Sequence, residues 1–577
     1  MTAAPTIRKL TIERYRTLEH FEWRPGSGVN VLVGGGDVGK TTIIEAVALL
    51  FSPTNATLVS DADYYNRDTM QGFTIEAIIS LPPDTDINHQ KHAAYPWEWD
   101  GLEAQVPDPT NPRKDTEPVY RVRVCGSDDL ELSYEVVDPD EGVHHFGVAV
   151  RRTIGLVRLG GDDRNDRDLR LVQGSALDRL IGDKKLRTKI AQKLGATEGL
   201  IDIEHEATER LAKLSTAFAE SGLPTDLELG VTGGHGMSVN ALIGLTAEKN
   251  GVHLPLSSWG SGTRRLASLE IAAANQTDHP IVVVDELERG LEPYRQRLLM
   301  SDLLERASQV FVTTHSPIVL AAATEATLWY VDVTGTIGQL SKKQEAHRLR
   351  DSEGYLARLA VVVEGDTEIG FVRHLLRTQL PSNLLEHGVV VTCGGGNLPA
   401  LDILDSLSAS GLAVAGFADS EGVKEDCWKR VQARLGPLLH RWPNGCIEQN
   451  ILPLVPDDEL EEFITPPGGT AGARLRTVAD RLRVQDNSYA MLAAHPNFRT
   501  TIIEAATGNA PDTLSHDVKK QWKSHERAWF KSVDGGDELA VKVLASSAWN
   551  SLKPQLMPFV DAIREKAIPK KAADARE

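Results

Sequence analysis

A glycine-rich segment near the start of the chain limits the possible fold more than any other feature. Residues 34–41 have the sequence GGGDVGKT, which fits the phosphate-binding pattern GxxxxGK[ST]. The segment lies between an apolar run at residues 29–33 and a helix-like run at residues 43–50. A strand, a glycine loop and a helix in this order predict an α/β fold that holds a nucleoside triphosphate at the helix N-terminus. A glycine-rich turn without a nucleotide is the alternative.

The residues of this loop have defined tasks in such a site. Lys40 would neutralise the β- and γ-phosphates, and the Thr41 hydroxyl would ligate Mg²⁺. The residues that we expect to contact the nucleotide here are Gly34, Gly36, Asp37, Gly39, Lys40, Thr41 and Thr42.

Two acids after a second apolar run predict the metal and water side of the same site. The run IVVV at residues 281–284 is typical of a buried strand and leads into Asp285 and Glu286. Asp285 would hold the magnesium shell. Glu286 would act as the general base that polarises the attacking water.

Two further segments narrow the prediction to one kind of ATPase. Upstream of the acids, the sequence LSSWGSGTRR leads into a helical pattern, where an ABC-type signature belongs. Ser261 and Gly262 would present N–H groups to a γ-phosphate held by a second subunit, so hydrolysis would require two heads. Downstream, the apolar run at residues 310–314 leads to His315, at the position of the switch histidine that touches the γ-phosphate.

The N-terminal stretch resembles the SMC-like branch of the ABC ATPases. Residues 7–16 alternate as a strand and contain a basic pair, as that branch's opening strand does. Two features depart from the pattern. Gly36 stands where that branch commonly has asparagine, and the nearest Q-loop candidate, Gln71, lies in a turn before a strand expected at residues 73–81. The Q-loop residue is therefore unassigned.

Length and composition predict a soluble protein with two to four domains. The chain has 577 residues, of which 41% are hydrophobic and 25% charged. No apolar stretch approaches the roughly twenty residues that span a membrane, so we expect a cytoplasmic protein. The net charge of −19 argues against coating nucleic acid over the whole surface but allows a local basic groove. Neither a zinc site nor a disulfide framework is indicated by the separated cysteines Cys125, Cys393, Cys427 and Cys446.

The long interval between the phosphate loop and the second pair of acids predicts an insertion. Residues 82–118 are rich in Pro, Asp, Asn and Trp, which is typical of a surface excursion. Strands are expected at residues 119–124 and 130–137. Residues 176–221 have helical periodicity, and a helical hairpin on such a head would mediate self-association or form a solvated lid. The chain lacks a heptad run long enough for an extended coiled coil.

After about residue 348, three apolar runs alternate with helical patterns and end in polar turns. The first run leads into Glu364, the second into the glycine turn GGGN, and the third into Asp419 and Glu421. This order predicts a small parallel sheet with acids gathered at the carboxyl ends of its strands. Several carboxylates in one place favour a divalent cation, because they otherwise raise one another's pKa.

This half resembles the TOPRIM domain of topoisomerases, primases and some nucleases. TOPRIM behind an ABC head resembles the OLD (overcoming lysogenization defect) nuclease family, which includes the nuclease subunit of the Gabija antiphage system. The resemblance implies metal-binding acids at Glu364, Glu368, Asp419, Glu421 and Glu448.

The resemblance also implies a late lysine that stabilises the transition-state phosphate, and Lys531 is the match. The adjacent sequence DGGD at residues 534–537 is similar to the family's lysine-glycine-aspartate stretch with the lysine missing. Two metal ions, Mg²⁺ or Mn²⁺, would support in-line attack on a phosphodiester, and Glu286, His315, Glu364, Asp419, Glu421 and Lys531 are the predicted catalytic residues.

Other interpretations of the second half stay open. The acids could cap a structural sheet, or the chain could be a noncatalytic ATP switch that scaffolds a partner effector. A topoisomerase lacks support because no tyrosine-bearing cleavage domain accompanies the acids, and a primase would leave the head unexplained. The dense basic stretch around Lys519, Lys520, Lys523 and Arg527 could face DNA or form a solvated helix face.

The predicted organisation is therefore an α/β protein with two catalytic parts. Residues 1–165 and 225–345 would form the ABC-type P-loop ATPase domain, and residues 166–224 an inserted helical dimerisation region. Residues 355–577 would form a Rossmann-like TOPRIM nuclease domain with a C-terminal helical extension. The expected ligands are ATP, Mg²⁺ or Mn²⁺, and DNA. The expected assembly is a homodimer or larger homo-oligomer, with a helicase or another defence protein as a possible partner and no membrane.

Overall fold

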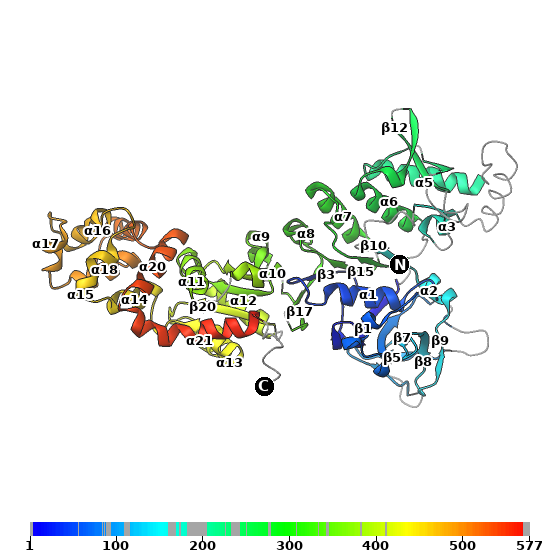
Figure 1. The fold of residues 1–577 in the computed structure, drawn as a ribbon, viewed down its shortest axis with the longest axis horizontal. Helices are drawn as coiled ribbons and strands as arrows, with labels where there is room; N and C mark the ends of the chain where they lie inside the picture. The colour runs from blue at the N-terminus through cyan, green and yellow to red at the C-terminus, as the bar shows by residue number, and fades with distance from the viewer. Residues whose placement is uncertain are drawn as a thin grey trace. The chain divides into compact units, whose positions relative to one another are not determined.

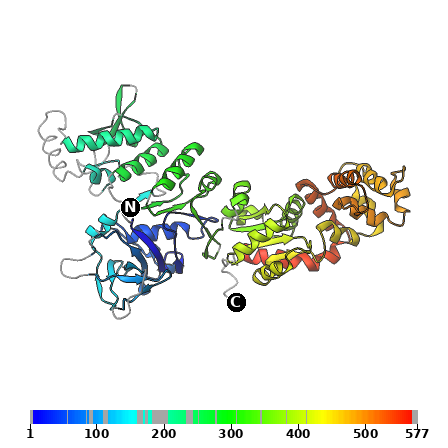
Figure 2. The same ribbon diagram turned by 180° about the vertical axis from the view of Figure 1, so that it is seen from behind.

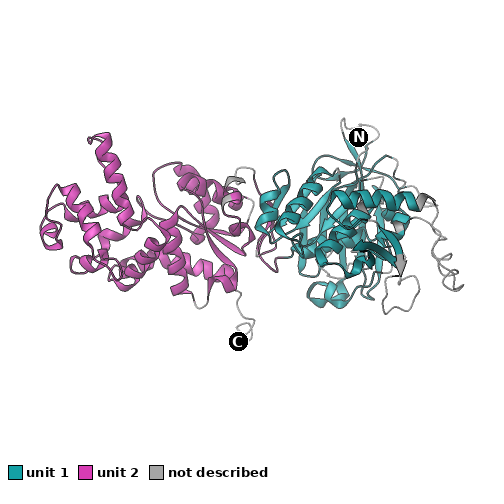
Figure 3. Cartoon of the chain, turned by 90° about the horizontal axis from the view of Figure 1, so that it is seen from above, with its two compact units in different colours: residues 1–33, 39–329 teal, residues 34–38, 330–577 magenta. Residues whose placement is uncertain are grey.

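The chain forms two compact units, which Figure 3 colours separately. Unit 1 comprises residues 1–33 and 39–329, and unit 2 comprises residues 34–38 and 330–577. Figures 1 and 2 show the elements from opposite sides. The structure, a computed structural model, describes residues 4–568 except 56, 84, 86, 88–93, 109–115, 160–168, 172–174, 182–204, 226, 232–242, 250, 275–278, 307, 333, 342–344, 381–382 and 410–411.

Unit 1 contains an antiparallel sheet built around the N-terminal strand. Its strand order is β2-β1-β4-β7-β5-β6, and β8 pairs with β7 and with β9. The alternation that predicted a strand at residues 7–16 places Leu10 and Ile12 in the core and leaves Lys9 and Thr11 partly exposed. The strands are β1 (Thr6–Tyr15), β2 (Leu18–Trp23), β4 (Phe73–Ser80), β5 (Trp97–Trp99), β6 (Ala104–Gln105), β7 (Glu117–Gly126), β8 (Leu132–Val137) and β9 (Val143–His145).

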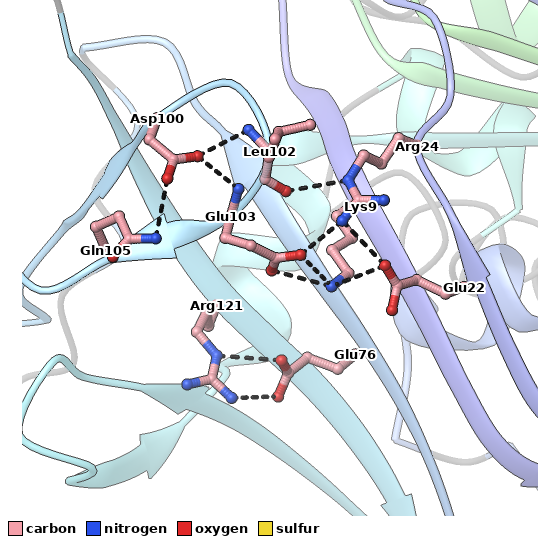
Figure 4. A network of polar contacts seen from close by, with 9 residues as sticks. All are labelled: Lys9, Glu22, Arg24, Glu76, Asp100, Leu102, Glu103, Gln105 and Arg121. Carbon is pink, nitrogen blue, oxygen red and sulfur yellow. Dashed lines mark hydrogen bonds and ion pairs between the residues drawn. The ribbon is translucent and has the colours of Figure 1, made fainter.

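The predicted surface excursion at residues 82–118 contains the short strands β5 and β6 and is fastened to this sheet. Glu103 lies 2.7 Å from the Lys9 ammonium and 2.6 Å from the Arg24 guanidinium (Figure 4). The Arg121 guanidinium lies over the Trp97 ring, 4.8 Å from the ring centroid. A cavity of about 300 Å³ lies among Lys9, Glu76, Glu103 and Arg121. Lys9 already pairs with Glu103, and Arg121 already pairs with Glu76. We therefore infer that the ion pairs of Glu103 hold the 82–118 segment against the sheet.

A second, parallel sheet in unit 1 carries the nucleotide motifs. Strands β10 (Leu156–Leu159), β14 (Ile281–Val284), β15 (Val310–Thr313) and β3 (Val29–Val33) lie side by side in that order. All four pair in parallel, with Val283 opposite Phe311 and Val312 opposite Val31. β16 (Thr327–Val331) continues the sheet beyond β3, and the boundary between the units falls within it. The carboxyl ends of β3, β14 and β15 therefore meet at one edge.

Helices accompany this sheet and complete unit 1. They are α1 (Lys40–Leu50), α2 (Val148–Ile154), α3 (Ala176–Ile181), α5 (His205–Glu220), α6 (Ser261–Ala274), α7 (Pro293–Glu305) and α8 (Pro317–Ala322). α3 and α5 both contact α6, beside a three-stranded sheet of β11 (Glu228–Val231), β12 (Ile243–Lys249) and β13 (Val252–Pro255). The helical prediction for residues 176–221 is confirmed at both ends, while residues 182–204 lie outside the described part.

Unit 2 contains the predicted small parallel sheet. Its strand order is β19-β18-β20-β21, and all neighbours are parallel. The strands are β18 (Leu359–Val363), β19 (Val389–Cys393), β20 (Val414–Ala418) and β21 (Leu439–Arg441), and the helices between them are α11 (Asp366–Gln379), α12 (Asn397–Ala409) and α13 (Glu425–Leu435). β17 (Ile337–Gln339), α9 (Glu345–Arg350) and α10 (Glu353–Leu356) precede the sheet.

A helical extension follows the sheet and shares its core. It comprises α14 (Ile447–Ile451), α15 (Asp457–Ile464), α16 (Gly472–Leu482), α17 (Tyr489–Ala493), α18 (Phe498–Thr507), α19 (His516–Ser524), α20 (Val533–Ala545) and α21 (Trp549–Ala567). α20 packs closely on α11 (Figures 1 and 2). A Cβ on Gly536 would lie 1.9 Å from the Thr367 carbonyl oxygen, and one on Gly370 would lie 1.9 Å from the Val533 carbonyl oxygen. Gly370 on α11 and Gly536 of the DGGD sequence on α20 therefore allow the two helices to approach.

Candidate active sites

The phosphate loop joins β3 to α1. Asp37 and Gly39 both have left-handed backbone conformations, with φ of 59° and 94°, and Gly39 precedes the first turn of the helix. Gly34 also has positive φ, and a Cβ there would lie 2.2 Å from the Val331 carbonyl oxygen. Lys40 is buried at the start of α1. The loop thus has the glycines where the backbone requires them, at the N-terminus of a helix that can receive phosphate.

Asp285 lies at the end of β14, directly opposite the start of α1. Its Oδ1 accepts a hydrogen bond from the Thr313 hydroxyl at 2.5 Å and lies 3.4 Å from the Thr41 hydroxyl. Thr41 and Asp285, the two predicted magnesium ligands of the head, are therefore neighbours. Thr42 is also buried, 3.4 Å from the Thr17 hydroxyl.

Glu286 has an unusual backbone for a general base candidate. Its φ is 48°, in the left-handed region that glutamate rarely adopts, and its N–H donates to the Thr313 hydroxyl at 2.8 Å. Such conformations cost about 1–3 kcal/mol and concentrate at functional sites. Its carboxylate is partly exposed and lies 3.4 Å from the Arg289 guanidinium.

His315 follows β15 at the same edge of the sheet. Partial burial of the ring and the nearby Lys40 ammonium lower the pKa of His315. A neutral imidazole can donate or accept a hydrogen bond, as a contact with a γ-phosphate requires.

Ser261 and Gly262 form the start of α6, beside the loop that follows Asp285. A Cβ on Gly262 would lie 2.2 Å from the Gly290 carbonyl oxygen, so only glycine fits at this approach. The buried Arg265, four residues on, donates to the Asp285 and Arg289 carbonyl oxygens. Sequence reasoning missed Arg265 and Thr313, although each lies within or beside a motif.

The surroundings of Gln71 do not assign it as the Q-loop residue. It forms part of a short 3-10 turn, where its amide donates to Asp68 at 2.8 Å. β4 follows at Phe73, as the sequence predicted. Gly36 has open space around its Cα, so a side chain such as asparagine would fit there.

In unit 2, Glu364 and Asp419 lie at the carboxyl ends of neighbouring strands. Glu364 Oε1 accepts the Asp419 N–H at 2.6 Å and the Asn397 side-chain amide at 2.7 Å. Asp419 Oδ1 is buried and has no hydrogen-bond partner. Burial raises the pKa of Glu364 and, together with the nearby Glu368 carboxylate, that of Asp419. Two hydrogen bonds thus fix one oxygen of Glu364, whereas one buried oxygen of Asp419 accepts none.

Glu368 and Glu448 extend this acidic group. Burial and the Glu448 carboxylate raise the pKa of Glu368. Glu448 is fully buried, and its carboxylate lies 2.8 Å from the Lys531 ammonium. Burial acts against the charge of Lys531, but the Glu448 carboxylate raises its pKa overall. The structure therefore places the predicted late lysine and the predicted downstream acid in one ion pair.

Glu421 does not share the burial of these acids, although its charge still helps to raise the pKa of Glu364. Its side chain is exposed, because Ser420 pairs with Gly445 and the chain then turns toward α13. Within the described residues, no three His, Cys, Asp or Glu side chains are arranged to enclose a metal ion. The donor set nevertheless fits a divalent cation, since Asp419 Oδ1 is a buried carboxylate oxygen without a donor.

Two residues that sequence reasoning missed orient these acids. Asn397 is buried at the start of α12 and donates to Glu364, and its carbonyl lies 3.4 Å from the Trp428 indole nitrogen. Arg441 donates to the Asp419 carbonyl oxygen at 3.2 Å and pairs with Glu425 at 2.6 Å. Asn397 closes the GGGN turn, which was the signal that could have revealed it.

A comparison with known protein families supports the assignment of a nucleotide-binding site in unit 1. Residues 76–321 match the family described as "AAA domain, putative AbiEii toxin, Type IV TA system". The matched range begins after the phosphate loop and includes Asp285 and His315. Together with the geometry at the strand edge, this match supports an ATP-binding, ATPase-type α/β head. Across the described residues, no helix has both the length and the apolarity to cross a membrane.

Other similarities are shorter or weaker. Over 46 residues, 8% of this chain, the sequence is 39% identical to the DNA replication and repair protein RecF of Teredinibacter turnerae, and the match spans 12% of that protein. The Smc head domain of Pyrococcus furiosus, solved with the C-terminal domain of ScpA, has a TM-score of 0.39 and 14% identity, covering 60% of this chain and 99% of that one. A RecF structure from the RecFOR pathway has a TM-score of 0.34 and 12% identity, covering 59% and 99%. These TM-scores are too low to assign a function.

Proposed function

We propose that the chain is an ATP-hydrolysing, divalent-metal-dependent DNA endonuclease of the OLD type, in which the head controls the nuclease. The proposed nuclease activity rests mainly on the neighbouring acids Glu364 and Asp419. Two buried carboxyl groups lie at neighbouring strand ends, where Glu364 Oε1 accepts the Asp419 backbone N–H and Asp419 Oδ1 has no donor. Such an arrangement is costly without a cation.

In the head, Lys40 and the loop before it would bind the ATP phosphates, and Thr41 and Asp285 would hold Mg²⁺ between them. Glu286 would take up a proton from the attacking water, and His315 would contact the γ-phosphate. Ser261 and Gly262 would complete the site of a second copy, so the active form would be a homodimer or larger homo-oligomer.

In unit 2, Glu364, Glu368 and Asp419 would hold one or two Mg²⁺ or Mn²⁺ ions, and Glu448 would join them if its pair with Lys531 opened. A bound cation supplies charge to stabilise the leaving oxygen of a phosphodiester and to polarise a water. The residues of the chain orient the ligands, since Asn397 fixes Glu364 Oε1. Lys531 would balance charge on the phosphate. Glu421, being exposed, would contact the ion only after the loop moved.

A role in antiphage defence is part of this proposal. The OLD resemblance implies such a role, and the description of the family that matches residues 76–321 names a putative AbiEii toxin. A helicase or other defence protein would then be a partner, and the protein would act in the cytoplasm.

One observation favours a second function, a noncatalytic ATP switch that scaffolds an effector. Glu448, one of the acids expected to bind metal, is already paired with Lys531. This alternative expects ATP binding but no metal-dependent DNA cleavage under any nucleotide condition.

The deciding experiment is cleavage of supercoiled plasmid with Mg²⁺ or Mn²⁺, with and without ATP. Wild type is expected to nick or cut the plasmid, and Asp419→Ala is expected to reduce cutting to background. Glu565→Ala, an exposed acid on α21, is the matched control and should cut as wild type does. Lys40→Ala tests the coupling, because unchanged cutting would refute control by the head.

A further inference from the structure

The Glu288 side chain accepts hydrogen bonds from two consecutive residues, Thr314 and His315, in the segment that follows β15. One carboxylate oxygen accepts the His315 backbone N–H at 2.7 Å, and the other accepts the Thr314 hydroxyl at 2.7 Å. Both are hydrogen bonds to an ionised acceptor, which are shorter and stronger than those between neutral groups. Glu288 thus holds the backbone from which the imidazole of His315 projects.

The neighbours of His315 are fixed as well. Before it, the Thr313 hydroxyl donates to Asp285, and after it the Ser316 hydroxyl donates to the buried Gln296 at 2.6 Å. Glu288 supplies the contact in the middle of this series. These contacts fix the backbone from which the partly buried ring of His315 projects.

Helix α6, which begins at the signature residues Ser261 and Gly262 and is called the signature helix below, also contacts the segment that carries Glu288. Arg265 donates to the carbonyl oxygens of Asp285 and Arg289, on either side of Glu288. At Gly290 the same segment meets Ser261 and Gly262. A movement at the start of α6 would therefore reach His315 through a short, continuous series of contacts.

We propose that Glu288 is a positioning residue for ATP hydrolysis, which acts through His315 and links its orientation to the signature helix. The inference rests on the proposed ATPase activity of the head. Neither the sequence motifs nor the matched family assigns a role to this residue.

The kinetic test is a double-mutant cycle between Glu288→Ala and His315→Ala. Each single variant is expected to lower kcat for ATP about a hundredfold, the size of effect that a misplaced group can produce. In the His315→Ala background, Glu288→Ala should lower kcat no further, because residues that act as one unit are non-additive. Binding of a fluorescent ATP analogue should stay near the wild-type level. Equal further losses in that background would instead show a general structural role and overturn the proposal.

A second measurement does not depend on hydrolysis. In histidine-labelled protein, the ring signals of His315, assigned by their loss in His315→Ala, should shift in Glu288→Ala. In Glu288→Gln they should stay closer to wild type, because the amide oxygen can still accept the His315 N–H. Unchanged signals in Glu288→Ala would refute the proposal even if that variant were inactive. If Glu288→Ala fails to fold, the signals of Glu288→Gln decide, and they should move partway.

The matched control is Glu292→Gln. Glu292 lies on the same loop, is partly exposed and pairs only loosely with Arg295, at 3.5 Å. It should leave kcat and the His315 signals unchanged. A wild-type protein that binds ATP without hydrolysing it would refute the proposed ATPase, while the ring signals would still decide the role of Glu288.

Discussion

Lowering the pH should destabilise unit 2 through a buried histidine under the acidic site. His440, on β21, stacks on Phe417 with ring centroids 4.8 Å apart and meets Trp442 edge-on, also at 4.8 Å. Its Nε2 is buried without a hydrogen-bond partner. Burial lowers the pKa of His440 from an ordinary value of 6.5 to about 4, although a hydrogen bond with the Gln555 backbone opposes the shift.

The sign and size of the effect follow from linkage. A histidine with a lowered folded-state pKa takes up its proton more readily in the unfolded chain. Its contribution to the free energy of unfolding is therefore complete above pH 6.5 and is lost as the pH falls toward 4. With these two values, the loss between pH 7.5 and pH 5 is about 2 kcal/mol, and the full loss at lower pH is about 3 kcal/mol.

The assay is urea unfolding at pH 7.5 and at pH 5, followed through the transition that reports on unit 2. The wild type is compared with His440→Phe. The phenylalanine ring suits the aromatic cluster of Phe417 and Trp442, and the variant lacks this titrating group while the other histidines remain. The fall in the free energy of unfolding should be about 2 kcal/mol smaller in the variant than in wild type. An NMR titration of His440 should give a pKa well below 6.5. Equal pH dependence of the two proteins would refute the reasoning.

Three further perturbations test other parts of the structure. Lys40→Ala should abolish the thermal stabilisation by ATP, which for wild type is about 2.7 kcal/mol at a ligand concentration of 100 Kd. Gly262→Ala should lower ATPase activity and destabilise unit 1 by about 1–3 kcal/mol, because its Cβ would lie 2.2 Å from the Gly290 carbonyl oxygen; unchanged kinetics and melting would contradict this. Arg474→Leu should lower the free energy of unfolding in urea by about 3–5 kcal/mol, since the half-buried Glu538 loses the buried guanidinium 2.8 Å away and keeps the more distant Lys542 at 3.8 Å; Arg474→Leu with Glu538→Leu should recover part of that loss.

The strand ends were predictable because one physical rule produces them. A fully apolar run followed by an acid, as at Asp285, Glu364 and Asp419, is the signature of a parallel strand whose carboxyl end faces a ligand. In each case the structure has a strand that ends directly before the acid. The parallel order of both sheets follows from the helices between the strands.

The contacts that orient the acids were not predictable in the same way. Glu288 and Asn397 act on residues 27 and 33 positions away, and no local pattern fixes such a distance. Glu421 is exposed, unlike Asp419, because the strand ends at Ala418 and a spacing of two residues no longer places side chains on one face. Packing accounts for both glycines of the DGGD sequence, because a Cβ on Gly536 would collide with α11 and one on Gly535 with the Phe530 backbone.

The two acidic strand ends differ in how their charge is balanced. In the head, Asp285 receives the hydroxyl of Thr313, and Arg265 approaches its backbone, so this acid is accommodated before any ligand binds. In unit 2, burial and neighbouring carboxylates raise the pKa of Asp419, whose Oδ1 has no donor. Lys531 pairs with Glu448 and also acts on Glu368 and Asp419, but burial and the neighbouring carboxylates keep the pKa of both acids raised. A divalent cation bound beside these acids would favour their ionised form and so lower their pKa values.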